Sequence, residues 1–470
     1  MTLTIRGLLP LVVAAAGCSA DRTLAEVPPR PSGEQRQEIP QSTNRDIDIL
    51  FVVDDSDSMA QEQDSLARNF PEFVRVLESI GDLPDVHLGV VSSNVGTAPY
   101  PVDDCEGDGD DGHLQLPAGC LPLTDGGRYI ANVADPAAPG GRRVNFTTAT
   151  MAEQFACMAE LGTGGCGFEQ HFESMRRALD GRNPGFLRDD AFLAVIFIQD
   201  EDDCSAADRS VFGDDPDLGH LSSYRCFEYG VRCEPDDPRT PGPRLDCEPR
   251  DDSPYMEDVR AYVDFLRALK ADPARVIVAG IAGAAGPVQV EVDPTRPTGE
   301  LWTRPVCTVC PGGGASCSAP LVSARPAVRL HALLDAFPQK STFQDLCAYD
   351  PAIDDVDLSG ALVQIAALLR RALGTPCLAG ALFDGDPAMD GVQPICSVSD
   401  FIDLRQPGQQ ENLLAACSGP LSCDGDLPDP PCYRFEPNEE CGTETDLTIV
   451  VERCEPAPPD TTVVVRCALE

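Results

Sequence analysis

Asp54, Ser56 and Ser58 could together hold a metal ion. They alternate in the stretch Asp54-Asp55-Ser56-Asp57-Ser58-Met59, directly after a run of apolar residues. Carboxylate and hydroxyl oxygens are hard ligands that suit a divalent cation such as Mg²⁺, Mn²⁺ or Ca²⁺. Because the two serines are neutral, they would leave the ion under-neutralised, with an open coordination position that a partner's Asp or Glu could fill.

The same residues allow a simpler interpretation. Ser and Asp are favoured N-cap residues, and a helical pattern follows them, so Asp54 and the two serines could serve only to cap that helix. The sequence leaves both interpretations open.

The elements around this stretch alternate between strands and helices. The apolar run Ile47–Val53 predicts a strand buried on both faces, the spacing from Leu66 to Ile80 predicts a helix, and Val86–Val91 predicts a second strand. Such alternation indicates an α/β fold with a doubly wound, mostly parallel sheet, in which ligands bind at the carboxyl ends of strands. Later predicted elements are a helix through Phe172 and Leu179, strands at 192–198 and 276–281, and helices at 259–269, 330–337 and 358–373.

The pentad Asp54-x-Ser56-x-Ser58 at the end of a central strand resembles the von Willebrand factor type A family, over roughly residues 46–376. In that family the pentad forms a metal-ion-dependent adhesion site. The resemblance implies that Asp54, Ser56 and Ser58 are metal ligands, and that Asp200, which closes the strand at 192–198, is the distal aspartate. We expect both segments to end at the same edge of the sheet.

The family also uses a threonine just before a later helix, and this chain departs from that pattern. Spacing to the helix places Cys166 at the threonine position, where a disulfide to Cys157 is expected and no hydroxyl can be offered. Either Thr163 replaces the missing hydroxyl, or a water does, or the site is weakened.

The cysteine content indicates an oxidising compartment. The chain has 21 cysteines in 470 residues, spread along its length and not clustered at metal-ligand spacing. Cys307, Cys310 and Cys317 are therefore predicted to form structural disulfides and not a zinc or redox site. A net charge of −42 makes nucleic acid an unlikely partner by electrostatic repulsion.

The N-terminus is typical of an exported lipoprotein. An apolar run from Gly7 to Ala16 is too short to span a bilayer, and it ends in Ala15-Ala16-Gly17-Cys18, which resembles a lipobox. Lipidation of Cys18 would leave 20 cysteines, an even number that can pair completely. The alternative is an ordinary signal peptide cut after Ala16.

Four segments follow from these patterns. They are a lipoprotein signal peptide at 1–18, a flexible tether at 19–45, a von Willebrand type A-like domain at 46–376 and a small cystine-rich β module at 377–470. Long disulfide-stapled loop insertions are expected near 95–150, 203–253 and 284–326.

The sequence favours a binding protein over an enzyme. The five histidines, His171 among them, lie in no HExxH or nucleophile-elbow context. We expect a protein that is lipid-anchored to a bacterial membrane, at the outer membrane or cell surface, and that uses a divalent cation to hold a carboxylate of a protein or cell-envelope partner. The alternatives are a metal-free envelope scaffold whose C-terminal module makes the contacts, and an anchored hydrolase for which no motif exists.

Overall fold

The structure is a computed structural model. It describes residues 33–40, 46–78, 84–296, 299–314, 317, 320–373, 378, 380–389, 391–402, 404, 408–419, 421–423, 429–437, 447–454, 457–458 and 461–470. The predicted signal peptide, the lipobox at Cys18, and Cys377 and Cys441 lie outside these residues. Within them, no helix combines the length and apolar character needed to cross a membrane.

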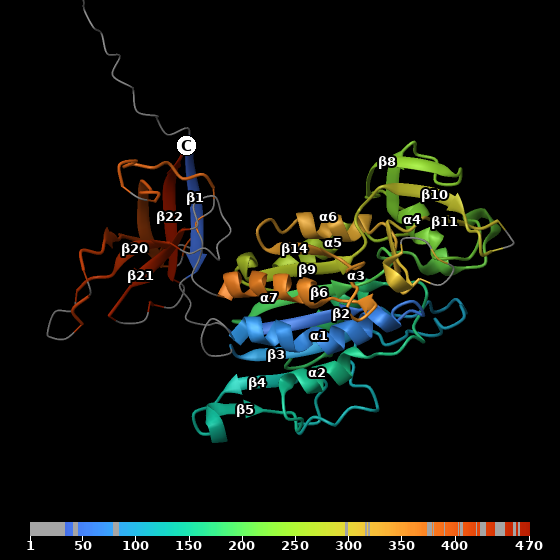
Figure 1. Cartoon of the computed structure of the whole chain (residues 1–470), viewed down its shortest axis with the longest axis horizontal. Coiled ribbons are helices and arrows are strands. Elements are labelled where there is room, and N and C mark those ends of the chain that lie inside the picture. Colours follow the sequence, from blue (N-terminus) through green and yellow to red (C-terminus); the bar gives the residue numbers. More distant parts are fainter. Residues whose placement is uncertain are drawn as a thin grey trace, which may run out of the picture.

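The largest sheet has the order β14-β9-β6-β2-β3-β4-β5 (Figure 1). Its first five strands run parallel, β4 pairs antiparallel with β3, and β5 pairs antiparallel with β4. The fold is therefore mixed α/β with a largely parallel sheet, and the four predicted parallel strands are confirmed. The bounds are β14 Ser341–Asp345, β9 Val276–Ala282, β6 Phe192–Ile198, β2 Ile47–Val53, β3 Val86–Ser92, β4 Ile130–Ala134 and β5 Arg142–Val144.

Helices cover both faces of this sheet, which explains the continuous apolar run of β2. Ile49, Phe51 and Val53 belong to the core under one helical layer, whereas Leu50 and Val52 belong to the core under the other. All seven β2 residues are buried. The first layer contains α1 (Ala60–Glu78), α2 (Met151–Ala159) and α7 (Ser359–Leu373), and the second contains α3 (His171–Arg177), α5 (Val259–Ala268) and α6 (Val328–Asp335).

An aromatic cluster fixes the first layer over β2. The ring of Phe51 lies 5.9 Å from Phe70 and 5.9 Å from Phe73 of α1, and 4.8 Å from Phe155 of α2. Burying each such ring contributes about 1.5–3 kcal/mol. The loop between β2 and α1, which carries Asp54, is thereby held at both ends.

The predicted insertions contain more regular structure than expected. Segment 95–150 includes β4 and β5, which extend the main sheet because β4 pairs antiparallel with β3, with Leu88 opposite Ile130. Segments 203–253 and 284–326 combine in one four-stranded sheet, because β8 pairs with β10 across the two insertions. Its strands are β7 (Val231–Glu234), β8 (Gly242–Pro249), β10 (Val288–Val292) and β11 (Leu301–Thr303). The insertions also contain α4 (Tyr224–Gly230) and the hairpin of β12 (Cys307–Val309) and β13 (Val322–Ala324). A short antiparallel pair, β15 (Tyr349–Asp350) and β16 (Asp355–Val356), follows later in the chain.

All 18 cysteines of the described residues form disulfides, in keeping with the predicted stapling. The expected Cys157–Cys166 bond is wrong. Cys166 pairs with Cys105, and Cys157 pairs with Cys120, because the segment after β3 returns to both cysteines. The other pairs are Cys204–Cys226, Cys233–Cys247, Cys307–Cys347, Cys310–Cys317, Cys396–Cys467, Cys417–Cys432 and Cys423–Cys454.

The C-terminal segment forms a cystine-bonded β unit that also includes residues from the predicted tether. Residues 33–40 form β1 and pair with β22 over their whole length, so this part of the tether prediction is wrong. The main-chain hydrogen bonds of β22 are completed by β1, and Ile39 is buried in the core of the unit. The unit has two sheets. The first has the order β1 (Gly33–Pro40), β22 (Thr461–Leu469), β17 (Cys396–Ile402) and β18 (Gln410–Leu413). The second has the order β19 (Ala415–Ala416), β20 (Cys432–Pro437) and β21 (Leu447–Glu452).

Candidate functional site

Asp54 and Asp200 end two neighbouring parallel strands of the main sheet. Val53 of β2 lies opposite Ile198 of β6, and the Asp54 N–H donates to the Ile198 carbonyl at 3.0 Å. The prediction that the two segments end side by side is confirmed. We call this end of the sheet, with Asp54, Ser56, Ser58 and Asp200, the crevice.

The loop after β2 is organised by Asp54 itself. Asp54 Oδ1 accepts a hydrogen bond from the Ser56 N–H at 2.8 Å, and the Ser56 and Ser58 hydroxyl oxygens lie 3.4 Å apart. Asp54 Oδ2 accepts no hydrogen bond. Asp54 therefore does not cap α1, which removes the simpler interpretation for this residue, while its role as a metal ligand stays a prediction.

Several buried oxygens at the crevice have no hydrogen-bond partner. They are Asp54 Oδ2, Asp200 Oδ1 and both carboxylate oxygens of Glu62 in the first turn of α1. All three side chains are buried, at 0%, 4% and 0% exposure. Leaving a buried polar atom unpaired costs about 1–3 kcal/mol, and more if it is charged. The residues present thus fit a bound cation, which would satisfy these oxygens.

The same carboxyl groups resist ionisation when no cation is bound. Burial, followed by the charges of Asp54 and Glu201, raises the pKa of Asp200 to about 8. Burial, followed by the charge of Asp200, raises the pKa of Glu62 to about 9. A bound divalent cation would reverse these shifts, because it favours the ionised form of each carboxyl.

His171, the first residue of α3, also faces Asp54. Its side chain is fully buried, and its Nε2 lies 3.4 Å from Asp54 Oδ2. Burial alone would lower the pKa of His171, but its interaction with the Asp54 carboxylate outweighs burial and raises that pKa. Sequence reasoning missed both His171 and Glu62. The sequence did offer a signal for each, namely its position next to a loop of the predicted site. His171 begins the helix after the Thr163 loop, and Glu62 lies in the first turn of the helix after the pentad.

The loop with Thr163 is held against the loop after β2. Gln63 of α1 donates from Nε2 to the carbonyls of Asp54 and Gly162, each at 2.9 Å, and the Gly165 N–H donates to the Asp55 carbonyl at 2.8 Å. Thr163, between Gly162 and Gly165, is half-buried. A Cβ on Gly165 would lie 2.3 Å from Asp55 Cγ, so this close approach requires glycine.

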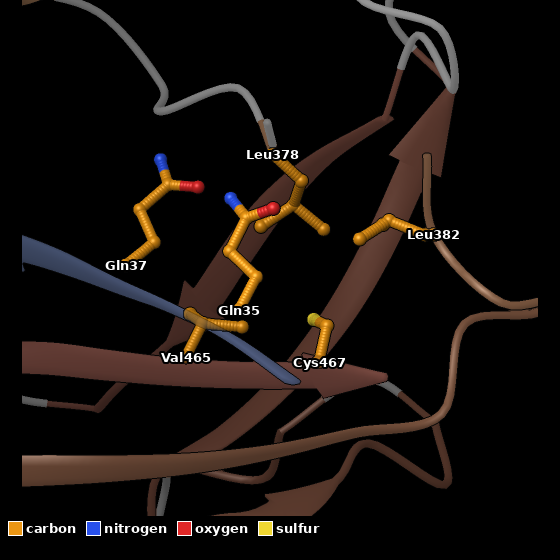
Figure 2. Close-up of a pocket in the computed structure, with 6 residues that line it drawn as sticks. All are labelled: Gln35, Gln37, Leu378, Leu382, Val465 and Cys467. Atoms are coloured by element: carbon orange, nitrogen blue, oxygen red, sulfur yellow. The ribbon is translucent and has the colours of Figure 1, made fainter. Parts of the chain in front are cut away.

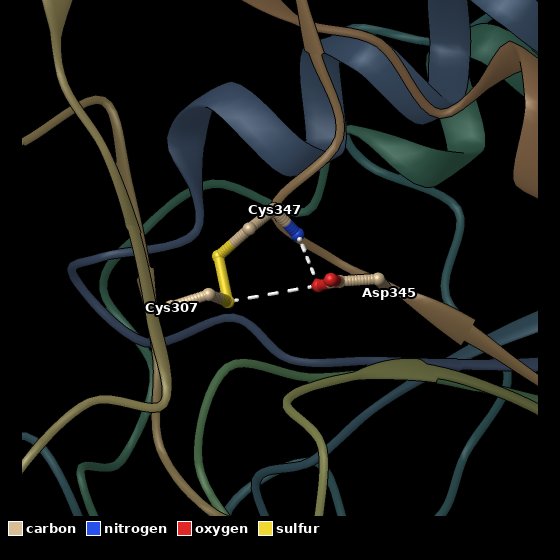
Figure 3. A group of neighbouring side chains, drawn as sticks. All are labelled: Cys307, Asp345 and Cys347. Carbon is tan, nitrogen blue, oxygen red and sulfur yellow. Dashed lines mark hydrogen bonds between the residues drawn. A yellow bond between two sulfur atoms is a disulfide. The ribbon is translucent and has the colours of Figure 1, made fainter. Parts of the chain in front are cut away.

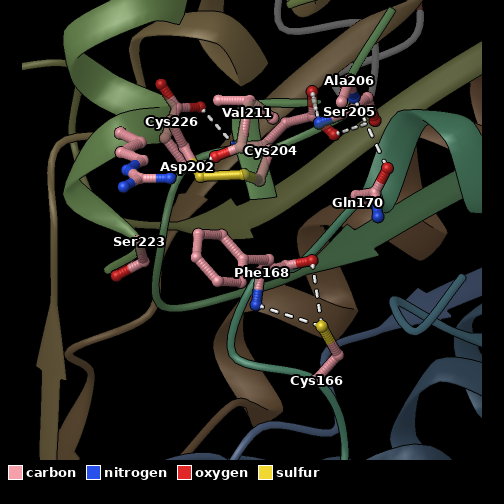
Figure 4. Close-up of a disulfide and its surroundings, with 12 residues drawn as sticks. Cys166, Phe168, Gln170, Asp202, Cys204, Ser205, Ala206, Val211, Ser223 and Cys226 are labelled. Carbon is pink, nitrogen blue, oxygen red and sulfur yellow. Dashed lines mark hydrogen bonds between the residues drawn. A yellow bond between two sulfur atoms is a disulfide. The ribbon is translucent and has the colours of Figure 1, made fainter. Parts of the chain in front are cut away.

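Cys166 offers no hydroxyl or thiolate to the crevice. It is bonded to Cys105, is fully buried, and its Sγ accepts from the Phe168 N–H at 3.4 Å. Figure 4 shows Cys166 and Phe168 beside the Cys204–Cys226 disulfide, which belongs to the insertion after β6. A third loop ligand would have to be Thr163 or a water.

Two groups in the described part of the chain bring three His, Cys, Asp or Glu ligand atoms within 4.8 Å of one another, which the crevice carboxyls do not, but each group contains a disulfide. In one, Asp345 Oδ1 lies 3.6 Å from Cys307 Sγ and accepts from the Cys347 N–H at 2.9 Å (Figure 3). The other combines the Cys417–Cys432 bond with Glu452. Disulfide sulfurs are not thiolates, so neither group is a metal site as it stands.

Two hollows elsewhere in the structure do not adjoin the crevice. One lies against β1 and β22, is lined by Gln35, Gln37 and Cys467 among others, and has no room for a water molecule (Figure 2). The other is an open groove of about 350 Å³ between β8, α5 and α6, lined by acidic and basic side chains.

Comparisons with known proteins find likeness only among solved structures. No family model matches the chain, and no curated protein matches it. The von Willebrand factor type A protein from Catenulispora acidiphila is 10% identical over 95% of this chain and 67% of its own, with a TM-score of 0.29. The pilus adhesin SpaC from Lactobacillus rhamnosus GG, in its open conformation, is 10% identical over 92% of this chain and 40% of its own, with a TM-score of 0.30. Likeness at this level assigns no residue a role.

Proposed function

We propose that this chain is an extracytoplasmic binding protein that uses a divalent cation in the crevice to hold an acidic group of a partner. The observation that carries the proposal is the pair of buried carboxylate oxygens, Asp54 Oδ2 and Asp200 Oδ1, that lack hydrogen-bond partners at adjacent strand ends. We assign the metal to Asp54, Ser56, Ser58 and Asp200, with Thr163 as a possible fifth ligand. The cation, Mg²⁺, Mn²⁺ or Ca²⁺, would supply the positive charge and a free position for a carboxylate.

The arrangement supports an adhesion site of the von Willebrand type A kind. The main sheet is largely parallel with helices on both faces, which we assign to the doubly wound class, and the crevice lies at the carboxyl ends of its central strands. We propose binding and not catalysis, because unpaired buried carboxylate oxygens beside serine hydroxyls have the chemistry of a cation site.

The disulfides support a location outside the cytoplasm. Nine bonds join the described cysteines, and such bonds persist in oxidising compartments. We propose lipid anchoring through Cys18 to a bacterial membrane, at the outer membrane or cell surface, and a protein or cell-envelope partner. Cys18→Ala should move the protein from the membrane to the soluble fraction of its native host, and membrane retention of this variant would contradict the anchor.

Thermal unfolding with and without metal tests the cation site. Saturating Mg²⁺ or Mn²⁺ should raise the melting temperature of the wild type, since a ligand at 100 times its Kd stabilises the native state by about 2.7 kcal/mol. Asp54→Ala should abolish the rise. Asp57→Ala is the matched control, because Asp57 is exposed in the same loop and should leave the rise unchanged.

Two results would count against the proposal. If wild type and Asp54→Ala respond identically to metal, or if neither responds, the crevice holds no functional cation. The metal-free scaffold, with contacts made by the C-terminal β unit, would then be the better description.

A further inference from the structure

His171 is a buried imidazole with no hydrogen-bond partner on either ring nitrogen. Its side chain is fully buried, and neither Nδ1 nor Nε2 takes part in a hydrogen bond. The nearest charged atom to its Nε2 is the Oδ2 of Asp54, at 3.4 Å, which is also without a hydrogen bond. The two atoms form an ion pair when His171 is protonated, but neither makes a hydrogen bond, whereas buried polar atoms are normally hydrogen-bonded.

The distance between these two atoms matches joint coordination better than direct hydrogen bonding. Charge-assisted N–H···O bonds are shorter, at about 2.7–2.9 Å. Two ligand atoms each ~2.1 Å from one ion are about 3.4 Å apart at a tetrahedral angle and about 3.0 Å apart at the right angle of an octahedron. The separation of 3.4 Å between His171 Nε2 and Asp54 Oδ2 is within reach of one shared ion in either geometry, with an opened angle in the octahedral case.

We propose that His171 is a direct ligand of the crevice cation, and that the site therefore selects Mn²⁺ or another first-row transition ion over Mg²⁺ and Ca²⁺. This inference rests on the proposed function. An imidazole nitrogen is a borderline ligand that suits transition ions, whereas Mg²⁺ and Ca²⁺ prefer oxygen alone. Within the described residues, no third carboxylate, imidazole or thiol atom lies within 4.8 Å of both His171 Nε2 and Asp54 Oδ2. Serine hydroxyls, water and the partner's carboxylate would complete the inner shell, and Asp200 would hold the cation through one of the bound waters.

The fold gives this ligand a rigid position. His171 begins α3, and the next residue, Phe172, packs in the core under that helix and donates its N–H to Asp203 at 2.9 Å. The hydroxyl of Ser174, on the same helix, donates a hydrogen bond to the main-chain carbonyl of Ser92 at the end of β3. The imidazole is therefore fixed relative to the strand ends that carry Asp54 and Asp200.

Pulsed electron paramagnetic resonance of Mn²⁺ bound to the full chain tests the proposal. Wild type should show coupling of the manganese to a nitrogen nucleus, and labelling histidine alone with ¹⁵N should change that coupling. His171→Gln should abolish the coupling and lower the ratio of Mn²⁺ to Mg²⁺ affinity at least tenfold in calorimetric titrations. His331→Gln is the control, because the Nε2 of His331 also makes no hydrogen bond, but this histidine is only partly buried and lies on α6.

The outcomes separate this inference from the function on which it rests. Mn²⁺ that binds wild type without nitrogen coupling, or an affinity ratio unchanged in His171→Gln, would overturn the histidine ligand and leave the cation site in place. If neither Mn²⁺ nor Mg²⁺ binds wild type, both proposals fail.

Discussion

Two buried aspartates lie at opposite ends of β2, and the protein treats them differently. Asp48, at the amino end, is fully buried and accepts hydrogen bonds from the Arg188 N–H and Nε, each at 2.7 Å, with Lys270 Nζ 3.6 Å away. Asp54, beyond the carboxyl end, has only His171 as an ion-pair partner, at 3.4 Å, with no Arg or Lys among the described ion pairs, and its Oδ2 accepts no hydrogen bond. A buried carboxylate needs a compensating cation. At the amino end the chain provides that cation, and at the crevice we infer that the solution must provide it.

The largest effect that would test this contrast is the loss of the Asp48 charge. Asp48→Asn should lower the free energy of unfolding by about 3–5 kcal/mol, because it leaves the fully buried Lys270 ammonium without its counter-charge. Asp54→Asn, measured in chelator, should change it by less than ~1 kcal/mol. Denaturant unfolding with the disulfides intact measures both. Equal losses in the two variants would show that the crevice is an ordinary paired site.

A smaller effect is expected in the pH dependence of stability. In chelator, Glu62 should keep its proton in the folded state up to its pKa of about 9, whereas in the unfolded chain it loses the proton near 4.5. The folded state binds more protons between these values, so its stability should fall as pH rises, by up to about 1.4 kcal/mol per pH unit. Glu62→Gln should remove this part of the slope. Parallel curves for wild type and Glu62→Gln between pH 5 and 8 would mean that Glu62 is ionised or solvated in the folded protein.

The smallest effect concerns Arg325, a cation beside the crevice. Its partly exposed guanidinium lies 3.0 Å from the Glu201 carboxylate. The positive charge of Arg325 also lowers the pKa of Asp200, against the larger effect of burial. Arg325→Gln should tighten Mn²⁺ binding about two- to threefold, since a partly exposed charge contributes only ~0.5 kcal/mol. Calorimetric titration measures the change. Weaker binding in the variant would indicate that Arg325 holds the crevice open or positions Asp200.

The central elements could be predicted because their signals are local. The apolar run at 47–53 and the run at 192–198 became β2 and β6 with the expected bounds, and Asp54 follows β2 directly while Asp200 lies two residues after β6. Once the two strands are neighbours, the position of Asp54 beside Asp200 follows from the parallel topology. The pentad and its place in the fold were therefore readable from the sequence.

Features that depend on distant contacts could not be predicted in this way. Residues 33–40 are polar and carry no apolar pattern beyond Ile39, and their strand form exists because β22 offers hydrogen bonds. Disulfide partners such as Cys105 and Cys166, 61 residues apart, are fixed by the path of the chain. His171 and Glu62 lie on helices, and the packing of each helix against the sheet decides which of its side chains point to the crevice. The spacing of residues in one sequence therefore did not identify either residue as part of the site.

The pairing of β2 has a mechanical consequence for a protein that holds a partner. A pull between a ligand at Asp54 and the chain before Ile47 would run along the axis of β2 itself. This strand is hydrogen-bonded to β3 on one side and to β6 on the other over all seven residues. When a strand is pulled along its own axis, the hydrogen bonds to its neighbouring strands are loaded in shear. They then bear the force at the same time, and they do not break one after another. The load would therefore pass along β2 and be shared with its two neighbours, β3 and β6.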